Sequence, residues 1–177
     1  ANCVGNDDCL DMACDGDCDQ IAYIDDCGEC DDSSNTDCVD LTLELHDGPN
    51  LISFYALAED VSVETIFGDA DGVLTEGGAA FNNDGNWIGS LSEISRTSGY
   101  WLKVINDDVL EIDGSESSID LEYDLHYGNN LISFPRDESI SVTDGIPNDI
   151  EHLVVSIIGE GLATIQQNCN YNWVGSL

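Results

Sequence analysis

The chain has 177 residues, of which 37 are acidic and only three are basic, so its formal net charge is -34. Such a surface repels phosphate backbones and anionic lipids, so we expect neither nucleic-acid binding nor membrane insertion. An apolar content of 42% still allows a hydrophobic core, and the length fits one large domain or a few small ones. Self-repulsion on this scale favours cations or high ionic strength.

The first 39 residues are rich in cysteine and poor in large apolar side chains, so cross-links or metal must order them. Dense cysteine in a short segment predicts disulfides and an oxidising, extracellular or cell-surface location. The number of cysteines before residue 39 is odd. Either one of them pairs with the last cysteine or a bond forms between chains. The cysteines are Cys3, Cys9, Cys14, Cys18, Cys27, Cys30, Cys38 and Cys169.

Aspartates alternate along part of this segment, in the run Asp15-Gly-Asp17-Cys-Asp19. Carboxylates on alternate residues of a tight loop suit calcium, which takes several hard oxygen ligands. The pair Cys27 and Cys30 also raises zinc or redox chemistry, but no histidine precedes His46 and no βαβ pattern surrounds the pair. We predict a calcium site drawn from Asp15, Asp17, Asp19, Asp25, Asp26 and Asp31.

From residue 40 the periodicity becomes that of β structure. Residues 41–45 alternate apolar and polar side chains, residues 48–50 predict a turn, and residues 51–56 predict a returning strand. Ser62 predicts the start of a short helix that Gly68 ends. Further strands are predicted at 73–75, 79–82, 87–91 and 99–105.

The polar run 113–118 predicts a linker, after which the pattern begins again. Residues 119–126 and 131–134 predict a second hairpin, and residues 141–146 take the place of the short helix. Residues 153–158 predict a strand. The expected division is a Cys/Asp-rich segment 1–39, a β-repeat 40–113, a linker 114–118 and a β-repeat 119–177.

Two motifs occur twice in the same order. The LISF box reads LHDGPNLISF at residues 45–54 and LHYGNNLISF at residues 125–134. The NW box reads NWIGSL at residues 86–91 and NWVGSL at residues 172–177, and a Gly-rich stretch precedes each copy, at 75–80 and 158–163. This is an internal duplication. We therefore predict a mainly β fold of two small tandem antiparallel modules, of sandwich type, with short helical elements.

The run CDGDC at residues 14–18, followed by IDDCGEC at residues 24–30, resembles the Asp/Cys/Gly spacer repeats of large secreted bacterial surface proteins. The LISF and NW boxes resemble the β-repeats of the same class. Glycines usual in the spacers are replaced here by Asp19-Gln20 and Asp31-Asp32. The resemblance implies a secreted surface protein and no particular activity.

Two residue types invite a functional interpretation. His46 and His126 are equivalent, which favours a role beside each turn over a metal or catalytic role. Asn50 and Asn130 are equivalent too, and we expect them to hold the turns. Trp87 and Trp173 are also equivalent, which favours core packing over an exposed platform for sugar rings. The acidic residues are too many for any carboxylate pair to indicate a glycosidase. No nucleophile elbow, phosphate-binding loop or zinc-protease motif occurs, so we expect no enzymatic activity.

The second copy stops at Leu177, where the strand equivalent to residues 99–105 would begin. A module without this strand exposes a sheet edge that a strand from another chain can fill, although a cut from a longer protein gives the same pattern. The predicted assembly residues are Ile21, Tyr23 and Ile24 as donor and Leu177 beside the acceptor. The leading hypothesis is a filament or surface-layer subunit that forms homo-oligomers. The alternative is a calcium-dependent glycan-binding or adhesion module.

Overall fold

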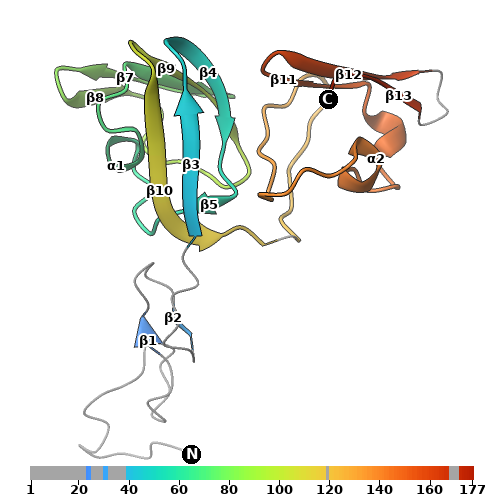
Figure 1. Ribbon diagram of the computed structural model, residues 1–177, viewed down its shortest axis with the longest axis horizontal. Helices are drawn as coiled ribbons and strands as arrows, with labels where there is room; N and C mark the ends of the chain where they lie inside the picture. Colours follow the sequence, from blue (N-terminus) through green and yellow to red (C-terminus); the bar gives the residue numbers. More distant parts are fainter. Residues whose placement is uncertain (1–22, 25–29, 32–38, 119, 168–171) are drawn as a thin grey trace, which may run out of the picture. The chain divides into compact units, whose positions relative to one another are not determined.

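The computed structural model describes Tyr23–Ile24, Cys30–Asp31, 39–118, 120–167 and 172–177 (Figure 1). The chain forms two compact units, one ending at Pro135 and the other spanning Arg136–Leu177. Antiparallel sheets with short helices make up both units, which confirms the predicted mainly β fold. In the described residues, no helix is long and apolar enough to cross a membrane.

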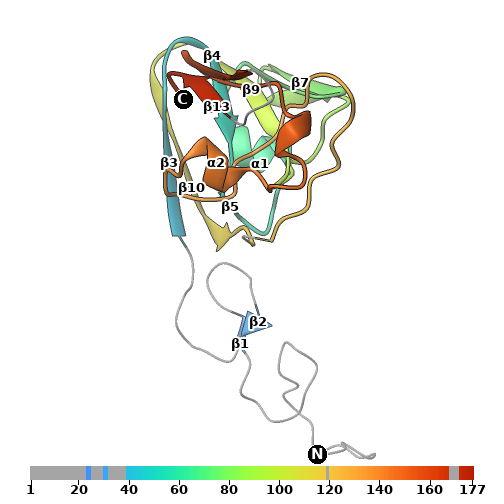
Figure 2. The ribbon, with the colours of Figure 1, turned by 90° about the vertical axis from the view of Figure 1, so that its right-hand side faces the viewer.

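Two sheets form the body of the first unit. The larger has the order β4-β9-β6-β7-β8, and the smaller has the order β3-β10-β5. Figures 1 and 2 show β3 and β10 running side by side along one face of the unit. The strands are β3 (Val39–Leu45), β4 (Gly48–Ser53), β5 (Ala56–Leu57), β6 (Gly72–Thr75), β7 (Gly78–Asn83), β8 (Asn86–Gly89), β9 (Gly99–Val104) and β10 (Asp108–Glu116).

The core of this unit contains an aromatic cluster. Phe54 is fully buried, and its ring centroid lies 6.0 Å from that of Phe67 and 5.8 Å from that of Tyr100. Helix α1 (Val63–Phe67) brings Phe67 into the cluster. The side chain of Ser62 accepts a hydrogen bond from the backbone N–H of Thr65, so the helix begins where the sequence predicted.

The predicted hairpin of residues 41–56 is wrong, although both of its strands exist. β3 pairs with β10, and β4 pairs with β9, so consecutive strands enter different sheets. The predicted turn residues 48–50 open β4. The predicted linker is also wrong at residues 114–116, which continue β10. A polar residue fits there because the buried Ser115 accepts hydrogen bonds from Arg96 at both its carbonyl and its hydroxyl oxygen.

The second unit contains α2 (Val142–Gly145), the 3-10 helix Glu151–Leu153 and a three-stranded sheet. Its strands are β11 (Ser156–Gly159), β12 (Leu162–Gln167) and β13 (Asn172–Gly175). Strand β11 begins three residues later than predicted. The register repeats that of β6-β7-β8, since Val73 faces Ala80 as Ile157 faces Thr164. The duplication in sequence is therefore a duplication in structure.

The NW boxes are held in the same way in both copies. A Cβ atom at Gly89 would lie 2.0 Å from the carbonyl oxygen of Ala79, and one at Gly175 would lie 2.0 Å from that of Ala163. The next residue of each box donates its N–H to that same oxygen, over 2.9 Å from Ser90 and 2.8 Å from Ser176. Glycine is required there because only a bare backbone fits this close approach.

The second predicted hairpin, at residues 119–126 and 131–134, is wrong. In the described part of 119–134 the only ladder contact is an isolated bridge between Ile132 and Ser98. The equivalent residues of the first copy, in β3 and β4, pair with β10 and β9. The described strands after residue 134 are β11, β12 and β13, which correspond to β6, β7 and β8 and not to β9 or β10. Residues 120–134 belong by sequence to the second copy but by contacts to the first unit.

Candidate functional site

The LISF box folds into a closed turn that its asparagine holds. In the first copy the amide oxygen of Asn50 accepts the backbone N–H of His46 over 2.9 Å. The amide nitrogen of Asn50 donates to the carbonyl oxygens of His46, at 2.9 Å, and Gly48, at 3.2 Å. The ring Nδ1–H of His46 donates to the carbonyl oxygen of Asp47, at 2.9 Å.

The second copy repeats each of these bonds. The amide oxygen of Asn130 accepts the N–H of His126 over 2.9 Å, and its amide nitrogen donates to the carbonyl oxygens of His126 and Gly128. The Nδ1–H of His126 donates to the carbonyl oxygen of Tyr127, at 3.0 Å. The asparagines and histidines of both boxes therefore bond within their own turns, as the sequence predicted, although the hairpins predicted around those turns do not form.

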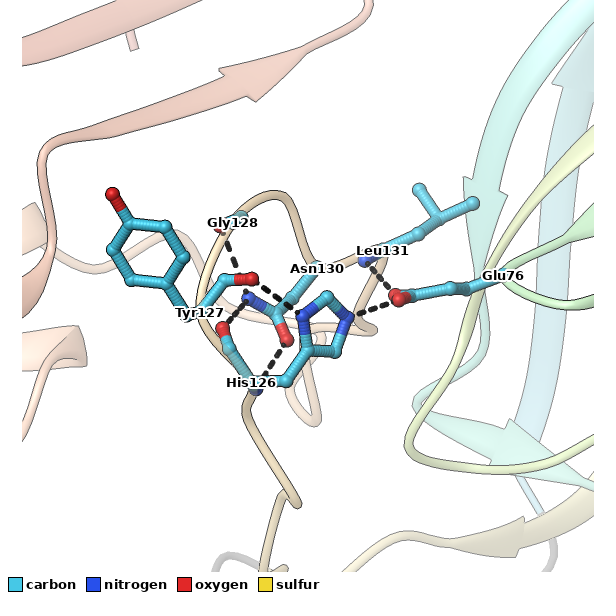
Figure 3. A network of polar contacts seen from close by, with 6 residues as sticks. All are labelled: Glu76, His126, Tyr127, Gly128, Asn130 and Leu131. Atoms are coloured by element: carbon cyan, nitrogen blue, oxygen red, sulfur yellow. Dashed lines mark hydrogen bonds and ion pairs between the residues drawn. The ribbon is translucent and has the colours of Figure 1, made fainter.

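The second box makes further contacts with the first repeat, which we call the clasp. Figure 3 shows the His126 ring facing the Glu76 carboxylate, with which its Nε2 atom forms an ion pair. The other carboxylate oxygen of Glu76 accepts the N–H of Leu131 over 3.1 Å. Glu76 lies in the two-residue turn between β6 and β7, where Gly77 has a φ of 78°. A single carboxylate thus binds both the ring and the backbone of the box.

Backbone contacts complete the clasp. The N–H of Gly99 donates to the carbonyl oxygen of Leu131 over 3.0 Å, and the N–H of Ser133 donates to that of Thr97 over 3.2 Å. The hydroxyl of Ser133 donates to the carbonyl oxygen of Arg96. Residues 131–133 therefore lie alongside residues 96–99, which lead into β9, and form hydrogen bonds with them.

Both side chains of the ion pair have shifted pKa values. The pKa of Glu76 is lowered, first by the hydrogen bond from His126 and then by that from the N–H of Leu131. The pKa of His126 is raised, first by the hydrogen bond to the Tyr127 carbonyl and then by Glu76. Both ring nitrogens of His126 face acceptors, so the geometry favours the doubly protonated imidazolium.

The clasp is expected to loosen above neutral pH. His126 has its pKa raised above 6.5, so its contribution is complete below pH 6.5 and is lost as the pH rises through the raised pKa. Glu76 has its pKa lowered below 4.5, so its contribution is complete above pH 4.5 and is lost as the pH falls through the lowered pKa. Hydrogen-exchange protection of the Leu131 amide should therefore fall from pH 6 to pH 8. In a His126→Gln variant the same amide should show no such fall, and a fall of equal size there would contradict the assignment.

Arg96 joins the clasp to the body of the first unit. Its guanidinium donates to the carbonyl oxygen of Ser115 (2.7 Å), the hydroxyl of Ser117 (3.3 Å), the carbonyl oxygen of Leu57 (3.1 Å) and the hydroxyl of Ser115 (2.8 Å). These acceptors are neutral and lie where β5 meets the end of β10. One of the chain's three basic residues is thus used to hold the fold together.

The tryptophans of the NW boxes are half-buried and bonded within the protein. The indole N–H of Trp87 donates to the carbonyl oxygen of Gly68 over 3.2 Å, and the ring packs against the core beside Phe67. The indole N–H of Trp173 donates to the carboxylate of Glu151 over 2.9 Å. These contacts agree with the structural role predicted from the repeat. The side chain of Trp101, on β9, is 39% exposed.

The N-terminal site residues lie mostly outside the described residues. This holds for Asp15, Asp17, Asp19, Asp25, Asp26 and Ile21, and for all the cysteines except Cys30. Tyr23–Ile24 form β1, which pairs antiparallel with β2 (Cys30–Asp31). Leu177 is half-exposed. In the part of the chain that the structure describes, no three acidic, histidine or cysteine side chains gather closely enough to hold a metal.

One acidic pair in the described residues is electrostatically unfavourable. Asp40 and Asp113 face each other across β3 and β10, and the hydrogen bond and charge of Asp40 raise the pKa of Asp113. Like charges directly opposite each other in a sheet are destabilising.

Glu76 and Arg96 were not identified as functional residues from sequence. For Glu76, the sequence signal that could have been used was its matching position in the two repeats. The register aligns Glu76 with Glu160, so a glutamate-glycine turn recurs in the repeat just as the histidine does. No protein-family model, curated protein sequence or solved structure matches the chain.

Proposed function

We propose that the protein is a non-enzymatic structural subunit of an extracellular filament or surface assembly, which polymerises by adding a strand from one subunit to another. The observation that carries the proposal is the outer edge of β11. In the first copy, β6 lies between β7 and β9. In the second copy, β11 pairs with β12 and is an edge strand of its sheet.

The side chains at this edge differ from their equivalents in the first copy. Val73 is fully buried beside β9, whereas the equivalent Ile157 is half-buried. Leu74 is 45% exposed, and the equivalent Ile158 is 73% exposed. An exposed, uncharged apolar edge strand is a template for another strand, and natural proteins often blunt such edges with charge. The four residues of β11 carry no charge.

The proposal includes a donor and a role for cations. The donor is the apolar run at residues 21–24, with Ile21, Tyr23 and Ile24 as the contacting residues and Leu177 beside the acceptor edge. Subunits with a formal charge of -34 repel each other, so association requires screening. Calcium bound to the Asp-rich segment would supply that screening close to the donor.

A matched pair of edge variants tests strand addition. Ile158→Lys places a charge on the acceptor edge, and Leu74→Lys places the same charge at the equivalent residue, whose strand β9 already covers. We expect the wild type and Leu74→Lys to form filaments visible by electron microscopy in calcium buffer, and Ile158→Lys to stay dispersed. If both variants form filaments alike, the β11 edge is not the site where a strand is added. A wild-type protein that stays monomeric, with its cysteines paired internally, would contradict the function.

Trp101 supports a second candidate, a calcium-dependent glycan-binding or adhesion module. Its side chain is partly exposed on β9, an interior strand of the larger sheet between β4 and β6, and sugar rings stack on such aromatic faces. This candidate requires binding on a glycan array that is lost both on chelation and in Trp101→Ala. Filament formation without such binding would favour the first candidate.

A further inference from the structure

We infer that the second LISF box, residues 125–134, has a second binding position, on its own repeat. When a strand from a neighbouring copy pairs with β11, residues 128–133 leave the clasp and pair with the far edge of that strand. The apolar side chains of the box, which the clasp leaves exposed, then become part of the core of the second repeat. The inference rests on the proposed strand addition, and it adds the response of the subunit that accepts the strand.

The two LISF boxes bury their apolar side chains very differently. In the first copy, the exposed fractions of Leu45, Ile52 and Phe54 are 6%, 8% and 0%. The equivalent side chains of the second copy are 46%, 47% and 40% exposed, at Leu125, Ile132 and Phe134. Burial of apolar surface is favourable, so a state that covers these side chains is favoured over the clasp wherever a suitable surface is present.

The second unit lacks the core that these side chains would supply. In the described part of 136–177, the buried residues are Glu151 and Thr164, and neither is apolar. In the first unit, by contrast, the corresponding sheet and its LISF box share one apolar core, which contains Phe54 and Val73. The sheet of the second unit has the same register but no such core, and a sheet needs another layer to bury its apolar face.

The strand order of the first repeat shows where the second box fits. There β9 lies between β6 and β4, and β4 pairs with β9 along its whole length, from Gly48 facing Val104 to Ser53 facing Gly99. In the second copy, β11 corresponds to β6, and residues 128–133 correspond to β4. A strand added to β11 takes the place of β9, so its far edge is available to residues 128–133 in the register of the first repeat.

The contacts that the box gives up are few and lie at the surface. In the described residues, the clasp contains one isolated bridge, between Ser98 and Ile132, in place of the ladder that β4 forms. The side chains of Glu76 and His126 are both exposed, and water replaces such an ion pair at little cost. The described part of 117–127 contains no strand or helix, so this segment can extend when the box moves.

A peptide that copies β9 tests the inference in the full-length chain. The probe is a synthetic peptide of residues 98–106. Its control carries Leu102→Asp, because Leu102 is buried in the core of the first unit. We expect calorimetry to show binding of the first peptide and not of the control. Hydrogen-exchange protection should rise in β11 and fall at the Gly99 amide, which donates to the Leu131 carbonyl in the clasp.

Two variants within the box separate its two positions. Phe134→Ala deletes a ring that is largely exposed in the clasp but is expected to be buried in the completed repeat. Its affinity for the peptide should therefore fall about 100-fold, as expected for the loss of a buried aromatic ring. Tyr127→Ala is the matched control, because the Tyr127 side chain is fully exposed and its equivalent in the first copy, Asp47, is exposed as well. This variant should bind the peptide like the wild type.

A third variant tests whether the box must leave the clasp. Glu76→Gln removes the ion pair to His126, so opening costs less and the peptide should bind about threefold more tightly. Glu138→Gln, with the same charge change at an exposed site, should leave the affinity unchanged. If Glu76→Gln binds no better than the wild type, the box stays in the clasp and the inference is wrong.

The remaining outcomes distinguish the inference from the proposed function. If Phe134→Ala binds the peptide and forms filaments like the wild type, the box takes no part in the completed repeat, and strand addition at β11 stands. The same conclusion follows if the wild type forms filaments but does not bind the peptide. A wild type that neither binds the peptide nor associates overturns the proposed function itself.

Discussion

Replacing Phe54 by alanine is expected to lower the free energy of unfolding by about 3–5 kcal/mol, the usual cost of deleting a buried aromatic ring. The Phe54 side chain is fully buried, and its ring contacts those of Phe67 and Tyr100. These rings come from a strand of the larger sheet, the helix α1 and the residue after β4. A cavity there would remove contacts between three separate elements of the first unit. Urea denaturation at fixed ionic strength measures the loss.

The duplication supplies a matched control. Phe134 is the last residue of the second LISF box, as Phe54 is of the first, but its side chain is 40% exposed. We expect Phe134→Ala to cost less than about 1 kcal/mol, because little area is uncovered by the change. Equal losses in the two variants would contradict the different environments that the structure gives to identical sequences.

Local signals predicted most elements of the first repeat, although β10 was missed and residues 51–56 form parts of two strands. Ser62 and Gly68 bound α1 as their cap chemistry predicted, and alternation located β3. Short strands at β6, β7, β8 and β9 followed from apolar runs between Gly/Asn turns. These features depend on residues within a few positions of each other, which is the range that a single sequence encodes most directly.

Strand partners were not predictable in the same way. β3 and β4 are neighbours in sequence but enter different sheets, and the partner of β3 lies beyond residue 107. The LISF boxes show the limit most clearly. The same ten-residue pattern gives a strand where β9 is available and a clasp on another repeat where it is not. Tertiary context therefore decides between the two outcomes.

The same difference between local and distant contacts applies to the candidate site. Asn50 and Asn130 bond within their own box, over four residues, and their turn role was predicted from sequence. The ion pair between Glu76 and His126 spans 50 residues and changes no local pattern. In a chain with 37 acidic residues, no single glutamate stands out from composition. Only the alignment of the two repeats distinguishes Glu76 and Glu160.

Replacing Arg96 by methionine is expected to lower the free energy of unfolding by about 2–4 kcal/mol, because several hydrogen bonds from one charged donor are lost together. Methionine fills a similar volume but cannot donate, so it leaves the carbonyl oxygens of Leu57 and Ser115 without this partner. Buried acceptors that lose a charged donor carry a desolvation penalty. Ser115 and Ser117 are both buried, so water does not readily replace the guanidinium.

A second readout separates a loss of stability from a loss of the clasp. The carbonyl oxygen of Arg96 accepts the hydroxyl of Ser133, and the neighbouring Thr97 accepts the Ser133 amide. If Arg96 positions this segment, the Ser133 amide in Arg96→Met should lose hydrogen-exchange protection under conditions where the variant remains folded. Arg136→Met removes the same charge from an exposed side chain and should change stability by less than about 0.5 kcal/mol. Equal destabilisation in the two variants would show that net charge, and not the bonding of Arg96, controls the stability of the unit.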